Sequence, residues 1–102
     1  MEENDAALLI FFSSVSSGPA RRMDSLVASI ARKERRYLRV LYVDIDERPD
    51  LAVRFRVQAV PTLVLVKQGR VVERIEGRVS AARLVHAIEP HVIEKAAFGA
   101  SS

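Results

Sequence analysis

The first half of the chain combines a continuous apolar run, an amphipathic helix and a second strand, and this succession restricts the possible folds more than any other feature. Residues 7–12 are all apolar, which is typical of a strand covered on both faces. Pro19 begins a predicted helix that ends near Arg35 and turns one apolar stripe inward: Met23, Leu26, Val27 and Ile30. Residues 38–45 read as the next strand. This order predicts two parallel strands joined by a right-handed crossover.

The second half of the chain predicts a short helix and a hairpin. Pro49 begins the short helix, whose inward residues are Leu51, Ala52 and Phe55. Two strands follow at 62–66 and 71–75, and Gln68-Gly69 forms the turn between them. The hairpin completes a predicted four-stranded sheet.

A final helix closes the predicted domain. Ser80 caps this helix, which we expect to break near Pro90. Its predicted buried residues are Leu84, Val85 and Ile88. The element order is then β-α-β-α-β-β-α, an α/β class, in one domain over residues 1–95 with a flexible tail at 96–102.

Composition excludes several classes of chemistry. The 102 residues are 49% hydrophobic, enough for one core without metal or disulfides. The chain has no cysteine, so disulfides, thiolate nucleophiles and cysteine-ligated metals are excluded. The start of the chain is acidic, and the longest apolar run, residues 6–12, is too short to span a bilayer. We therefore expect a soluble, cytoplasmic protein with no membrane contact and no cofactor.

Several landmarks recur at fixed spacing between Leu8 and about Val92: Gly18-Pro19, Asp46, Pro49, Val60-Pro61-Thr62, Gly69 and Gly77. In these positions the chain resembles the thioredoxin superfamily. The resemblance implies a three-layer α/β/α thioredoxin-like fold with a four-stranded mixed sheet, and a cis peptide bond before Pro61 (cis-Pro61). It also implies that the first strand and helix of the family are missing.

The departures from the family pattern concern its redox chemistry. Where the family has Cys-Gly-Pro-Cys, the chain reads Ser17, Gly18, Pro19 and Ala20. By the same resemblance, the buried aspartate of the family falls on Phe11, its lysine partner on Tyr42, and its tryptophans on Ser13 and Ser16. We therefore expect a degenerate motif with no catalytic residue, and a protein that is not an enzyme.

Ser17 has two interpretations. A serine nucleophile needs an adjacent base, and His86 and His91, the only histidines, both belong to the final helix, away from the motif. A serine at a helix start is explained by capping alone. The two histidines are also five residues apart, so they do not share a helical face, and no set of acidic ligands converges with them. No metal site is therefore predicted.

What the resemblance leaves is a binding surface beside the cis-proline. Its predicted residues are Ser16, Ser17, Gly18, Pro19, Ala59, Val60, Pro61 and Gly77. An extended peptide or protein segment pairs with backbone of this kind, so the first hypothesis is a redox-inactive binding module: an adaptor, assembly factor or chaperone-type protein. The alternative is that these residues only form turns and that the groove has no ligand.

Two further hypotheses use charge. The helix start at 17–20, with Arg21 and Arg22 nearby, is a candidate site for an anion or small ligand. A basic cluster near the end of the same helix is a candidate nucleic-acid surface: Arg32, Lys33, Arg35, Arg36 and Arg39. Glu34 interrupts the cluster and no aromatic platform accompanies it, which argues against nucleic acid. Cations at a helix end also complement the helix dipole.

An acidic group follows the second predicted strand. Asp44, Asp46 and Glu47 are interpreted as turn residues that also place negative charge at the start of the helix at Pro49.

Overall fold

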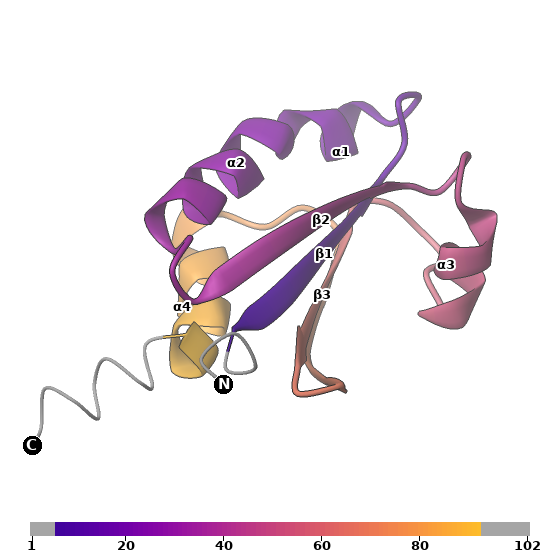
Figure 1. The fold of residues 1–102 in the computed structure, drawn as a ribbon. Coiled ribbons are helices and arrows are strands. Elements are labelled where there is room, and N and C mark those ends of the chain that lie inside the picture. Colours follow the sequence, from indigo (N-terminus) through magenta and orange to yellow (C-terminus); the bar gives the residue numbers. More distant parts are fainter. Residues whose placement is uncertain (1–5, 93–102) are drawn as a thin grey trace, which may run out of the picture.

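A mixed four-stranded sheet with helices on both faces forms the centre of the structure (Figure 1). The computed structural model describes residues 6–92, with these elements: β1 (Ala7–Ser13), α1 (Gly18–Arg22), α2 (Asp24–Lys33), β2 (Leu38–Asp44), α3 (Pro49–Arg54), β3 (Thr62–Lys67), β4 (Arg70–Glu76) and α4 (Ala81–Val92). The strand order is β2-β1-β3-β4. β1 is parallel to β2 and antiparallel to β3, and β3 is antiparallel to β4. The α/β class is confirmed, and the element order differs from the prediction only in that two helices, α1 and α2, stand where one was expected. The predicted tail at 96–102 lies outside the described residues.

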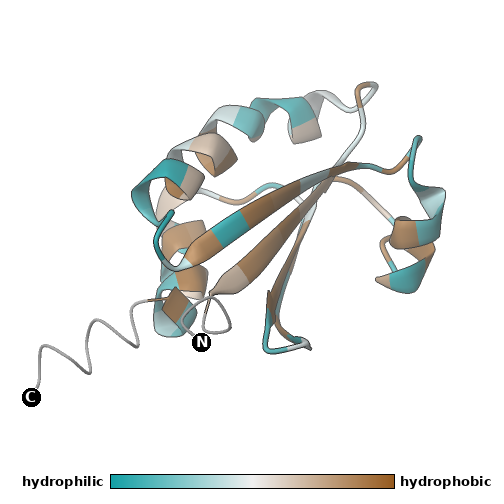
Figure 2. Ribbon diagram, in the orientation of Figure 1, coloured by the Kyte–Doolittle hydropathy of each residue, from teal (hydrophilic) through white to brown (hydrophobic). Residues whose placement is uncertain are grey.

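Two apolar clusters hold the layers together, one on each face of the sheet. The larger cluster joins Leu9 and Phe11 of β1 to Val27 of α2 and Leu84 of α4, all essentially inaccessible to solvent. On the opposite face, Phe12 and neighbouring apolar residues pack against α3. The hydropathy colouring shows the apolar strands at the centre and polar positions on the outer surfaces of the helices (Figure 2). β1 contributes to both clusters, which explains its uninterrupted apolar sequence.

The first predicted helix is two helices, and the expectation of one continuous helix is wrong. Met23 ends α1 and begins α2; its N–H donates to the Ala20 carbonyl at 3.1 Å, and its own carbonyl accepts from Val27 at 2.9 Å. Ala20, Met23, Val27 and Ile30 are all buried. Because the apolar stripe continues at helical spacing across the break, periodicity could not reveal the one-residue turn.

The final helix does not break at Pro90, contrary to expectation. α4 continues to Val92 with Pro90 inside it. Ile88 and Val92 are one turn apart and both are buried in the larger cluster, so their packing holds the last turn in helical form despite the missing Pro90 N–H. The carbonyl of His91 also accepts a hydrogen bond from Lys67 Nζ at 2.7 Å.

The predicted turns and caps are present. Gln68 and Gly69 have φ of 54° and 79°, the left-handed conformation that a two-residue hairpin turn requires. Ser80 accepts from the Arg83 N–H at 3.2 Å at the start of α4. Arg48 pairs with Asp50 in the first turn of α3, and this hydrogen bond lowers the pKa of Asp50. Asp50 is the acidic residue in the first turn of α3.

Candidate functional site

The residues of the degenerate motif, 17–20, lie in the loop after β1 and at the start of α1. The Ser17 N–H donates to the Ser14 carbonyl at 3.0 Å, which closes a tight turn before α1. Ser17 Oγ accepts the Ala20 N–H at 3.2 Å, so this hydroxyl caps the helix, as one interpretation of the sequence predicted. Gly18 and Pro19 are exposed, whereas Ala20 is fully buried.

The turn before β3 forms the second part of the site. The Val60-Pro61 peptide bond is cis, and Thr62 Oγ1 donates to the Ala59 carbonyl at 2.7 Å. The Gly77 N–H donates to the Pro61 carbonyl at 2.8 Å, which places this glycine directly beside the turn. Gly77 has φ of 85°, a conformation that side-chain-bearing residues rarely adopt.

The sheet register brings the loop and the turn to the same end of the molecule. Phe12 of β1 is paired with Thr62 of β3 in the antiparallel ladder. The chain therefore leaves β1 toward Ser14 at the same sheet end where it enters β3 from Pro61. The candidate residues from both segments border this end of the sheet.

A chain of hydroxyls and one carboxylate, which the sequence analysis missed, supports the loop. Ser14 Oγ donates to Asp46 Oδ2 at 2.6 Å and lies 2.9 Å from Ser16 Oγ. Ser14 is only 5% exposed, while Ser16 is exposed. The register pairs Ser13 with Asp44, so residues that follow these two parallel strands meet at one edge. The sequence already predicted that these two strands are parallel. The expectation that residues after parallel strands lie close together would therefore have predicted the contact between Ser14 and Asp46.

The acidic group after β2 therefore has a divided role. Asp44 Oδ1 accepts the Asp46 N–H at 2.8 Å, as expected for a turn residue. Asp46 instead accepts from Ser14 of the motif loop. Asp46 is therefore part of the turn through its N–H, and its carboxylate has a contact with the motif loop that the sequence did not predict.

The direction of the protons in this chain follows from its donors and acceptors. An ionised carboxylate can only accept, so the single proton of Ser14 is directed at Asp46. Ser14 Oγ must then accept from the Ser16 hydroxyl, and it also accepts the Ser16 N–H at 3.3 Å. The remaining lone pairs of Ser16 Oγ are left for an outside donor. The loop thus presents a hydrogen-bond acceptor to solvent.

We expect Ser14→Ala to lower the free energy of unfolding by about 1–3 kcal/mol, because it removes a part-buried hydrogen bond to a charged group. Ser16→Ala is the matched control and should change it by less than about 0.5 kcal/mol, since Ser16 is exposed. Urea denaturation followed by circular dichroism measures both changes. Equal effects of the two substitutions would contradict the stabilising role assigned to the bond between Ser14 and Asp46.

Phe11 and Tyr42 form an aromatic pair below the motif loop. They are direct neighbours in the parallel ladder, and their rings meet edge to face with centroids 6.1 Å apart. Phe11 is fully buried, and Tyr42 is 52% exposed. The positions that the resemblance assigned to a buried acid and its lysine therefore contain packing aromatics.

Comparison with known proteins agrees with this geometry. The thioredoxin family model matches residues 1–90. The chain belongs to the thioredoxin family. A thioredoxin-like protein of Synechocystis is 33% identical over 85 residues, covering 83% of this chain and 81% of that protein. Thioredoxin 1 of Nostoc is 29% identical over 90 residues, covering 88% and 84%.

Solved thioredoxins share the fold. A thioredoxin of Halobacterium salinarum superposes with a TM-score of 0.81 at 31% identity, over 89% of this chain and 78% of that chain. The germline-specific thioredoxin Deadhead of Drosophila gives a TM-score of 0.80 at 28% identity, over 86% and 83%. The thioredoxin-like fold class is thereby confirmed. Because this member of the family contains no cysteine, it has no thiol for disulfide exchange.

Two further sets of candidate residues of this thioredoxin-like chain are the arginines proposed for anion binding and the two histidines. The arginines proposed for anion binding, Arg21 and Arg22, line an open hollow with Gly18 that also contains the carboxylate of Asp24. His86 is exposed and His91 is partly buried, with its Nε2 4.0 Å from Glu73 Oε2. Within residues 6–92, no group of histidine and acidic side chains has the arrangement of a metal site. No helix in that range is long and apolar enough to cross a membrane.

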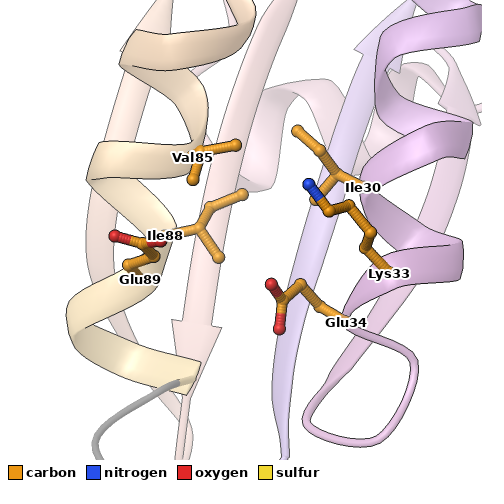
Figure 3. Close-up of a pocket in the computed structure, with 6 residues that line it drawn as sticks. All are labelled: Ile30, Lys33, Glu34, Val85, Ile88 and Glu89. Atoms are coloured by element: carbon orange, nitrogen blue, oxygen red, sulfur yellow. The ribbon is translucent and has the colours of Figure 1, made fainter.

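A separate pocket lies between α2 and α4 (Figure 3). Its volume is about 170 Å³, and Ile30, Val85 and Ile88 supply its apolar side chains. Charged groups of both helices surround it: Lys33, Glu34 and Glu89. None of the predicted groove residues lines this pocket.

Proposed function

We propose that this chain is a redox-inactive thioredoxin-like binding module that holds an extended segment of a partner protein beside cis-Pro61. The observation that carries the proposal is the backbone of Val60. The neighbouring carbonyl, that of Ala59, accepts a hydrogen bond from the Thr62 hydroxyl. The N–H and C=O of Val60, in contrast, make no hydrogen bond within residues 6–92. A residue with both groups free, at the end of a sheet, is suited to pair with one residue of an extended segment.

The motif loop supplies the other side of this groove. Ser16 offers an oriented acceptor to a donor of the partner, because Ser14 and Asp46 fix the direction of its hydroxyl. Val15 is 74% exposed beside it and offers apolar contact. Gly18 and Ala59 are small and exposed, so the backbone of a partner can approach closely. These features favour a protein or peptide partner with a free N–H donor, and they require no thiol or cofactor.

The proposal is tested by blocking the groove with a single substitution. Ala59 is exposed, and Ala59→Glu adds bulk and charge beside Val60 without entering the core. Ala82→Glu, at an exposed position of α4, is the matched control. We expect partners cross-linked and co-purified with the tagged wild type to be retained by the Ala82→Glu variant. The Ala59→Glu variant should lose them by about tenfold or more, corresponding to about 1.4 kcal/mol.

Thermal melts of both variants separate lost binding from lost folding, and both should melt within a few degrees of the wild type. Equal recovery of partners by the two variants would contradict the groove as the binding site. Recovery of no partner by the wild type would contradict the binding function itself.

A further inference from the structure

The two edges of the sheet differ in how they are protected against pairing with another strand. The outer strand β4 has a register irregularity opposite Leu65/Val66 and charges spread along its length: Arg70, Glu73, Arg74 and Glu76. Charges and bulges are the usual means of blocking an edge. The other outer strand, β2, has an unbroken register and only Arg39 and the terminal Asp44 as charged residues. Leu41 and Tyr42 at its centre are 44% and 52% exposed.

The outward-pointing backbone groups of β2 can be identified from the ladder to β1. At one end of the ladder the Ala7 N–H donates to the Tyr37 carbonyl at 2.9 Å. At the other end the Ile45 N–H donates to the Ser13 carbonyl at 3.0 Å. In a parallel pair, alternate residues of a strand bond to the same neighbour. Residues 39, 41 and 43 therefore bond to β1. Val40 and Tyr42 direct their N–H and C=O away from the sheet, where no strand of the described chain lies (Figure 1).

At the two ends of β2, one outward group each is already used by a turn. The Leu38 N–H donates to the Glu34 carbonyl at 2.8 Å. The Asp44 carbonyl accepts from Glu47 at 3.1 Å and from Arg48 at 2.8 Å. The carbonyl of Leu38 and the N–H of Asp44 have no partner among the described residues.

We propose that two copies of this chain pair antiparallel along the outer edges of β2, about a two-fold axis at Leu41, to form one continuous sheet. In this register Val40 faces Tyr42 of the second copy, and the two exchange both backbone hydrogen bonds. Leu38 faces Asp44 of the second copy, so the available carbonyl meets the available N–H. The two groups already used by turns face each other, and no outward group of β2 is left unpaired.

Neighbouring registers do not have this property. A two-fold axis perpendicular to the sheet lies between the two copies of one residue, so the adjacent registers are centred on Val40 or on Tyr42. Centred on Val40, Leu38 faces Tyr42 and cannot donate to it, because its N–H is bonded to Glu34. Centred on Tyr42, Val40 faces the Asp44 carbonyl, which already accepts two bonds. The pattern of free groups therefore selects the register centred on Leu41.

The charges at the two ends of β2 are opposite in sign, so they are complementary to those of a second copy that runs antiparallel. Exposed Arg35 and Arg36 precede β2, and exposed Asp46 and Glu47 follow it. Antiparallel pairing places the basic turn before β2 of one copy near the acidic turn after β2 of the other. Tyr42 would pack across the strands on Val40, and Leu41 on its own symmetry mate, which covers the two exposed apolar side chains. A partner with a uniform charge would not match both ends.

This interface is independent of the proposed peptide groove. The groove lies where β1 ends and β3 begins, whereas the dimer uses the side of β2 that faces away from β1. Either proposal can fail without the other.

Sedimentation equilibrium of the full chain tests the dimer. We expect a concentration-dependent shift from the monomer mass of 11.4 kDa to twice that mass, with a Kd of roughly 1–100 μM for an interface built on one strand pair. Leu41→Lys should weaken the dimer at least about tenfold, since it places two ammonium groups together at the axis. Val71→Lys, at a 52% exposed position of the other edge strand, is the control and should leave the Kd unchanged.

A charge exchange tests the antiparallel orientation of the two copies. Arg35→Glu and Glu47→Arg should each weaken the dimer several-fold, because each brings like charges near one another. The double substitution restores opposite charges and should return the Kd to near the wild-type value. A monomer at all concentrations would overturn the proposal, as would a dimer lost through Val71→Lys. A double variant as weak as the single variants would overturn the antiparallel arrangement of the two ends.

Discussion

Replacing Phe11 by aspartate is expected to unfold most of the protein at neutral pH. Phe11 is fully buried in the larger cluster, and loss of a buried phenylalanine costs about 3–5 kcal/mol. An unpaired carboxylate in the same place adds several kcal/mol more. The sum is comparable to the total stability of a typical domain, about 5–15 kcal/mol. Urea denaturation of the wild type, Phe11→Ala and Phe11→Asp separates the free-energy cost of the cavity from that of the buried charge.

The effect of the aspartate should depend on pH. Burial raises the pKa of the introduced carboxyl above its unfolded value of about 3.9, so the folded state keeps its proton longer as the pH rises. The stability of the Phe11→Asp variant relative to Phe11→Ala should therefore fall from about pH 4 upward. Adding Tyr42→Lys at the adjacent ladder position should recover part of the loss, because it supplies an opposite charge. An Asp variant as stable as the Ala variant at pH 7 would contradict the packing role of this position.

Restoring both cysteines, by Ser17→Cys with Ala20→Cys, is expected to give a protein that forms a disulfide and reduces insulin. The reason is geometric: Ser17 Oγ already accepts the Ala20 N–H at 3.2 Å, and a thiolate in the same place would be stabilised by the same donor. We expect a rate roughly tenfold or more below that of a complete thioredoxin, because Phe11 cannot assist proton transfer. Insulin turbidity with dithiothreitol measures the rate.

The single Ser17→Cys variant is the matched control, since it has a thiol but cannot close an internal disulfide. The parent chain, which has no cysteine, should show no rate above background. Turnover by the parent chain would contradict its redox inactivity. A double variant that forms no disulfide by mass spectrometry would show that the motif loop no longer has the family geometry.

Much of the fold could be predicted because its signals are local. The apolar run of β1, the Gln68-Gly69 turn and the Ser80 cap each depend on a few consecutive residues. The two errors arose where local signals compete with packing. The stripe from Ala20 to Ile30 concealed the turn at Met23, and the burial of Ile88 and Val92 outweighed the helix-breaking tendency of Pro90.

The sequence by itself determined the family, the order of the elements and the absence of thiol chemistry, because spacing, periodicity and residue type are properties of the chain alone. Only the tertiary structure decided that Ser14 donates to Asp46, thirty-two positions away, and that the backbone groups of Val60, Val40 and Tyr42 have no partner within residues 6–92. These facts depend on which strands lie side by side and in which register. Sheet register joins distant residues, so its consequences for hydrogen bonding are not visible in any local stretch of sequence.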